Sequence, residues 1–215
     1  MKKLFYLIPV IAVTAACAGF KPDYVVRDAS ENSKPDWTEY KNAYKSDDKA
    51  NKKNYRYYVN DATSPDQDLC LNLAESRSTQ RVASEIAQEI INKFQEKAQA
   101  TDEESSRKVK NELERNIQVN LHGVAVTGRY WEKRQYLKEL GAEKDKIGFK
   151  CDVAVRISND DLVKAIEAYR AKTMRQLSKD DQKAMETAVD ATIGLIKSGA
   201  PMVGAVADAI ATGAN

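Results

Sequence analysis

The sequence is short of the residues from which most enzyme sites are built. Among 215 residues there is one histidine, His122, and there are three cysteines. Neither a zinc site of paired histidines nor a histidine-based catalytic triad is indicated. His122 precedes Gly123 at an expected element boundary, where a surface or capping role fits better than catalysis. Glycine-rich phosphate loops and Gly-x-Ser-x-Gly motifs are absent too. We therefore expect no enzymatic activity, metal, cofactor or small-molecule substrate.

Charge of one sign and long hydrophobic runs are also lacking. The formal net charge of +2 includes Lys2 and Lys3, and without these two residues the charge is zero. A strongly basic surface is not indicated, so nucleic-acid binding is not expected. The apolar run at residues 4–13 contains Pro9 and falls short of the roughly 18 to 20 residues that a membrane-spanning helix needs.

The amino terminus has the pattern of a bacterial lipoprotein signal. A basic start and the apolar run lead to the small residues Thr14, Ala15 and Ala16, directly before Cys17. This pattern predicts a signal peptide at residues 1–16 and a diacylglycerol on Cys17 that binds the chain to a membrane. Because no aspartate follows the cysteine, we expect the outer membrane, on its periplasmic face or at the cell surface.

Two cleavage sites remain open. Thr14 stands where lipoprotein signals favour leucine, and Ala16-Cys17-Ala18 is itself a small-x-small site that would release a chain starting at Gly19. The first cleavage gives a lipid anchor, whereas the second discards the cysteine.

Composition divides the remainder into three parts. Residues 17–53 are polar and contain Pro22 and Pro35, which predicts a lipidated tether. Trp37 within this tether is expected to fold back onto the domain. Residues 54–171 carry the periodic patterns of a folded domain, and residues 172–215 form a helical extension rich in alanine and glycine.

The domain is predicted to be α+β, with a small antiparallel sheet packed against a long helix. Tyr55–Val59 is expected as the first strand and residues 60–63 as a turn. Ser64 is expected to cap a long helix, whose apolar stripe from Ala83 to Phe94 should lie on the sheet. A further capping pattern at residues 101–104 predicts a second helix.

Two more strands and two capped helices complete this prediction. Strands are expected at residues 124–136 and 149–157. In the second of these, alternation places Cys151 and Val153 in the core and Asp152 in water. Ser158 and Ser178 should each cap a helix, which gives the order β-α-α-β-β-α followed by the extension.

Cys70 and Cys151 remain once Cys17 is assigned to lipid. The expected compartment permits a disulfide. At 100° per residue, however, Cys70 lies about 160° round the helix from Ile90 and so points away from the expected sheet. Separate thiols are therefore favoured over a bridge.

Small residues four apart recur in the carboxy-terminal extension. They permit close helix packing. The helix could contact another copy or a protein partner, or it could fold against its own domain, and both interpretations stay open. The candidate contact residues are Ala200, Gly204, Ala205 and Ala209.

Several motifs in order resemble the lipoprotein-20 family of bacterial envelope proteins. After Cys17 come Lys34-Pro35-Asp36-Trp37, the strand Tyr57-Tyr58-Val59, the helix from Ala74 to Phe94 and the strand from Phe149 to Ile157. The resemblance spans roughly Pro35 to Ala171 and implies a dodecin-like sheet covered by a helix, as in secreted tumour-necrosis-factor-inducing proteins.

That family implies outer-membrane lipoproteins without known catalysis, some of which build disks around the flagellar motor. The expected function is accordingly a structural or protein-interaction module that can self-associate. The alternative is a periplasm-facing accessory activator of an envelope enzyme or motility assembly.

Overall fold

The computed structural model describes residues 21–39, 54–97, 103–173, 179–200 and 202. Four strands form one antiparallel sheet in the order β1-β3-β4-β2. Their bounds are β1 Tyr24–Ala29, β2 Tyr55–Ser64, β3 Ala125–Tyr136 and β4 Lys146–Ser158.

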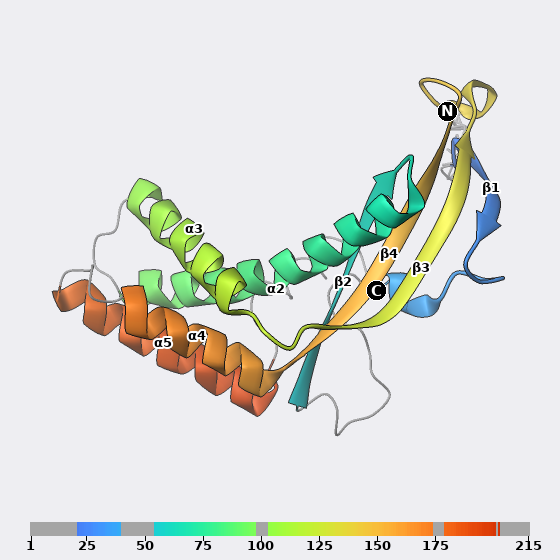
Figure 1. Ribbon diagram of the computed structural model, residues 1–215. Helices are drawn as coiled ribbons and strands as arrows, with labels where there is room; N and C mark the ends of the chain where they lie inside the picture. Colours follow the sequence, from blue (N-terminus) through green and yellow to red (C-terminus); the bar gives the residue numbers. More distant parts are fainter. Residues whose placement is uncertain (1–20, 40–53, 98–102, 174–178, 201, 203–215) are drawn as a thin grey trace, which may run out of the picture.

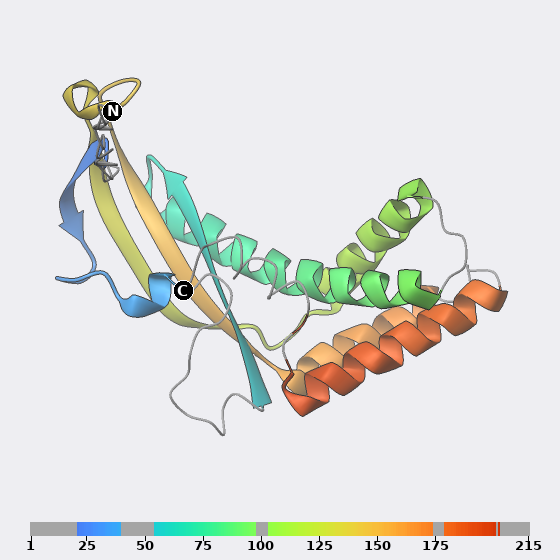
Figure 2. The same cartoon turned by 180° about the vertical axis from the view of Figure 1, so that it is seen from behind.

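Four described α-helices accompany this sheet. Helix α2 is the longest, and α3, α4 and α5 gather around its far end, with α4 and α5 side by side (Figures 1 and 2). The predicted α+β class, with an antiparallel sheet packed against a long helix and with carboxy-terminal helices, is confirmed. The bounds are α2 Gln67–Lys97, α3 Glu103–Asn120, α4 Asn159–Thr173 and α5 Lys179–Ser198, with short 3-10 helices η1 Asp36–Glu39 and η2 Lys138–Leu140.

Strand β4 is central, and both of its faces are buried from Cys151 to Val155. Cys151, Val153 and Val155 are fully buried on the face toward α2, as the alternation predicts. On the other face Asp152 is only 4% exposed, which corrects its expected contact with water. Because β3 and β2 flank this strand and η1 lies against its outer face, even a polar position there is covered.

The long helix α2 lies on the sheet only along its first half. Its second half projects past the strands, toward α3 and α5 (Figure 1). Ile86, Ile90 and Phe94 are buried in that second half. The predicted stripe begins where α2 still lies near the sheet, since Glu85 acts on Tyr58 of β2, and it continues to where α2 packs on α3 and α5. In the first half the sheet is contacted by the row Cys70, Ala74 and Ser78.

The segment predicted as a tether contains part of the fold. β1 pairs with β3 over Tyr24–Tyr136 to Ala29–Glu132, so the folded chain begins well before residue 54. Trp37 in η1 packs on β3, where a Cβ at Gly128 would lie 3.0 Å from the indole ring. Its predicted return to the domain is confirmed, and the tether prediction is wrong for residues 24–39.

The start of α2 also differs from the prediction. Residues 60–63 continue strand β2 instead of turning, because each pairs with β4. The cap is Asp66, whose carboxylate accepts the Leu69 N–H at 2.8 Å, and not Ser64. The strand therefore reaches almost to the helix, with only Pro65 and Asp66 between them.

The junction into α4 follows the sequence pattern. The Ser158 hydroxyl accepts the Asp161 N–H at 3.0 Å and lies 2.7 Å from the Asp161 carboxylate, so Ser158 caps α4. Gly123 faces this cap with a φ of 77°, and a Cβ there would lie 2.5 Å from the Asp161 carboxylate. The link from α3 into β3 thus needs glycine for both backbone conformation and space.

Candidate functional site

Cys70 and Cys151 form a disulfide between the first turn of α2 and the middle of β4. Their Cα atoms are 5.8 Å apart across a sequence separation of 81, and both side chains are fully buried. This corrects the prediction of separate thiols. That prediction measured the angle round the helix from Ile90 and assumed that Ile90 faces the sheet. Ile90 instead lies in the half of α2 that packs on other helices. Cys70 and Ile90 lie on different faces of α2, and both are fully buried, at different places along its length.

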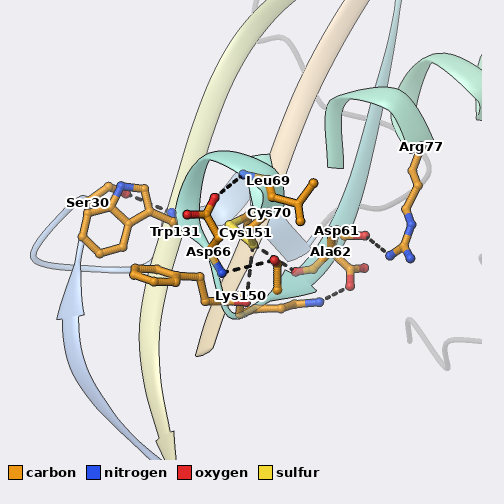
Figure 3. The surroundings of a disulfide bond; sticks show 12 residues. Ser30, Asp61, Ala62, Asp66, Leu69, Cys70, Arg77, Trp131, Lys150 and Cys151 are labelled. Atoms are coloured by element: carbon orange, nitrogen blue, oxygen red, sulfur yellow. Dashed lines mark hydrogen bonds and ion pairs between the residues drawn. A yellow bond between two sulfur atoms is a disulfide. The ribbon is translucent and has the colours of Figure 1, made fainter. Parts of the chain in front are cut away.

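Polar contacts surround the disulfide and join α2 to the sheet (Figure 3). The buried Ser78 hydroxyl donates to the Val153 carbonyl at 3.0 Å, two turns beyond Cys70. Arg77 donates to the backbone carbonyl of Asp61 at 2.9 Å, while the Asp61 carboxylate pairs with Lys150. These bonds fix the first half of α2 against β2 and β4.

A second polar group, the outer-face cluster, lies on the face of the sheet away from α2. We define it as Tyr130, Glu132, Arg134 and Asp152. The Tyr130 hydroxyl donates to Glu132 at 2.9 Å, and Arg134 donates to the same carboxylate at 2.7 Å through Nε and pairs with it at 2.6 Å. Both oxygens of Glu132 are thereby bound.

Burial shifts the proton affinities in the outer-face cluster. It raises the pKa of Tyr130 to about 12, and the hydrogen bond to Glu132 contributes. Burial likewise raises the pKa of Asp152, opposed by the nearby charges of Lys150 and Lys34. A tyrosine that stays protonated and a carboxylate already bound to arginine are poor nucleophiles and bases at neutral pH, so this cluster is suited to fixing the sheet.

The residues described by the structure contain no group of three or more histidine, cysteine or acidic side chains that could hold a metal ion. His122 is exposed beside Gly123. A shallow polar depression of about 440 Å³ lies where the start of β2, the start of α4 and the end of α5 meet. Its charged lining residues, Asp160 and Lys197, have opposite signs, so it has no strong preference for an anion or a cation.

Most of the predicted site residues fall outside the described part of the chain. This holds for Cys17, Gly204, Ala205 and Ala209. Ala200 is described and half-buried, and its carbonyl accepts a hydrogen bond from Arg56 of β2 at 2.8 Å. Position 200 therefore contacts its own domain. The same guanidinium lies 3.4 Å from the Leu195 carbonyl, so it holds the end of α5 against the sheet.

The sequence feature that could have identified the packing of α5 is the spacing of its aliphatic residues. Val189, Ile193 and Ile196 are buried, and α5 packs on α2 and α4. Arg56 could not be assigned as its partner, because a single arginine between tyrosines in a strand does not identify what it binds.

None of the described helices is long and apolar enough to cross a membrane. The buried disulfide is consistent with folding in an oxidising, extracytoplasmic compartment. No protein-family model, curated protein or solved structure matches the chain.

Proposed function

We propose that the chain is a non-enzymatic outer-membrane lipoprotein, anchored through Cys17, that serves as a structural or protein-interaction module of the cell envelope. The observation that carries this proposal is the buried disulfide, because such bonds persist in compartments that a signal peptide gives access to. The amino-terminal pattern ending at Cys17 supplies both the export signal and the attachment point.

The polar groups of the fold support a binding role over a catalytic one. Glu132 is bound to Tyr130 and Arg134, and Asp61 is paired with Lys150. These groups hold strands together and leave their reactive atoms engaged. An interaction module needs a stable framework of this kind, with its partners recognised at the surface.

Mass spectrometry of the mature amino terminus tests the anchor. We expect a peptide starting at Cys17 with a mass increase for a diacylglycerol and an acyl chain, and recovery of the protein in the outer-membrane fraction. The Cys17→Ala variant should lose both the modification and the membrane association. An unmodified chain starting at Gly19 in the wild-type cells would overturn the proposal.

Crosslinking in intact cells tests the module itself. Crosslinks mainly between copies of this chain would identify a self-associating structural element, whereas crosslinks to one foreign envelope protein would identify an accessory activator. Turnover by the purified protein of compounds in a broad substrate panel would contradict the non-enzymatic assignment.

A further inference from the structure

The folded chain begins beside the tip of the β3–β4 hairpin, which we define as residues 137–145. The backbone N–H of Leu137 donates to the Asp23 carbonyl at 3.1 Å, and Tyr24 pairs with Tyr136. Figure 1 shows β1 alongside the end of β3 that leads into this tip. Strand β1 thus fixes the point from which any amino-terminal anchor must reach.

Little chain separates that point from the proposed lipid. Cys17 and Asp23 are six residues apart (23 − 17 = 6), and six residues at full extension span at most about 22 Å. Because β1 belongs to the sheet, residues 24–29 cannot serve as spacer. The lipid would therefore hold the hairpin tip close to the membrane.

Exposed aliphatic side chains gather at this end of the sheet. Val25 and Ile147 flank Gln135 in one row across β1, β3 and β4, and they are 37% and 55% exposed. Val26 on β1 and Leu140 in η2 are 45% and 42% exposed. Among the described large hydrophobic side chains that are exposed, Val119 on α3 is the one remote from the sheet.

We propose, on the basis of the Cys17 anchor proposed above, that the hairpin tip and the adjoining ends of β1 and β4 lie against the lipid surface. Leu140 and Ile147 contact the acyl-chain boundary, and the adjacent rings of Tyr24 and Tyr136, with centroids 5.6 Å apart and tilted by 56°, lie at headgroup level. The helices α3, α4 and α5 then point away from the membrane. A lipid surface is the occupant that the short chain length favours, because the anchor brings it to the tip.

The charges at the tip predict how the contact depends on lipid composition. When Lys146, the first residue of β4, is counted with the tip, three lysines and three acids are interspersed there, so their formal charges cancel. Contact should therefore form equally on neutral and on anionic vesicles, and it should persist when salt is raised. These residues are Lys138, Glu139, Glu143, Lys144, Asp145 and Lys146.

Site-directed fluorescence on the lipidated full chain in phosphatidylcholine vesicles tests this orientation. With Cys17 acylated and Cys70 bonded to Cys151, an introduced cysteine is the one free thiol in the chain. Leu140→Cys and Val119→Cys both replace exposed aliphatic side chains, which makes them a matched pair. A straight strand with the length of β3 spans about 36 Å, and α3 lies beyond the end of β3 opposite the tip.

We expect a nitroxide on the lipid headgroup to quench the fluorophore at position 140 and to leave the one at position 119 bright. Equal quenching at both positions, or stronger quenching at 119, would overturn the orientation. So would a fluorophore at 140 that is shielded from aqueous iodide but not quenched by the lipid nitroxide, since a protein would then cover the tip.

Extending the chain supplies a second, independent test. Inserting twenty glycine and serine residues between Ala18 and Gly19 should reduce the quenching at position 140, because the tip is then free to leave the surface. Unchanged quenching would show that the short connection does not set the orientation.

Flotation of the vesicles separates this inference from the proposed function. A chain that floats with the vesicles but shows no quenching at position 140 contradicts the orientation alone. A chain that does not float contradicts the lipid anchor and removes the orientation with it.

Discussion

The two halves of α2 are buried by different means. The first half is held to the sheet by the Cys70–Cys151 disulfide and by the hydrogen bond from Ser78 to Val153. In the second half, large aliphatic and aromatic side chains are buried, among them Ile90 and Phe94. One helix therefore joins a covalently crosslinked sheet end to a helical end held by packing.

This difference shows how one helix can serve two partners. A sheet that accepts a helix along small residues, Cys70, Ala74 and Ser78, allows close approach and leaves little apolar area to bury. The bond between sulfur atoms and the side-chain hydrogen bond supplement that contact. Where α2 meets other helices, the larger side chains bury enough area on their own.

Removing the disulfide should have the largest effect. A loop of 81 residues closed by the bond corresponds to about 4.5 kcal/mol of unfolding free energy in the chain-entropy account. Chemical denaturation of the Cys70→Ala, Cys151→Ala double variant should show a loss of this order. Wild-type protein treated with a reductant is the control and should behave in the same way.

Hydrogen exchange on that double variant tests the comparison directly. Protection should fall first in β2 and the opening turns of α2, and later in α3 and α5. Loss of protection spread evenly over both ends would show that the two halves of α2 do not differ in how they are held.

Leu113→Ala should weaken the helical end by about 3 kcal/mol. Leu113 is fully buried on α3 and belongs to the core that includes the second half of α2. Denaturation measures the loss, and Val119→Ala is the control, since Val119 is 72% exposed on the same helix. Equal losses for the two variants would contradict this assignment.

A matched pair of hydroxyl deletions compares the contribution of one side-chain hydrogen bond to stability at the sheet end and at the helical end. Ser78→Ala removes a bond from α2 to the sheet and should cost about 1 kcal/mol. Thr192→Val removes a bond that Thr192 makes to the Ala188 carbonyl of its own helix, at 2.9 Å, and should cost less. Denaturation curves compare them, and an equal cost would show that the sheet contact of Ser78 contributes nothing of its own.

The smallest expected effect is a pH dependence from Asp152. Burial raises the pKa of its carboxyl above the usual 3.8, so the folded state binds this proton more tightly than the unfolded state does. Stability should therefore fall as pH rises from about 3.8 through the raised pKa and level off above it. Denaturation of Asp152→Asn over this range should show a flatter dependence, and an unchanged slope would assign it to other groups.

Local sequence patterns correctly predicted the elements that are determined by residues close to one another in the sequence. The alternation from Phe149 to Ile157 identified β4, and the Ser158 cap identified the start of α4. The three- and four-residue spacing of apolar residues from Ala83 to Phe94 predicted the long helix and its buried face. Strand β1 was missed because Tyr24–Ala29 is an edge strand whose side chains are mostly exposed, so it lacks an alternating apolar face.

Contacts between distant segments were the harder part. The disulfide depends on which part of α2 lies over β4, and a helical wheel has no information about position along the axis. Arg56 and Ala200 are 144 residues apart, and neither carries a motif. Asp152 is buried because η1 covers the outer face of the sheet. The segment that contains η1 was predicted to be a tether, because its composition is polar.

The pairing of β1 with β3 has a consequence for biosynthesis. Tyr24 meets Tyr136, which is 112 residues later in the chain (136 − 24 = 112). A chain that crosses a membrane amino terminus first delivers β1 before β3, and contacts of such sequence separation form slowly. Under the anchor proposed above, Cys17 would be acylated on a chain whose sheet is still incomplete.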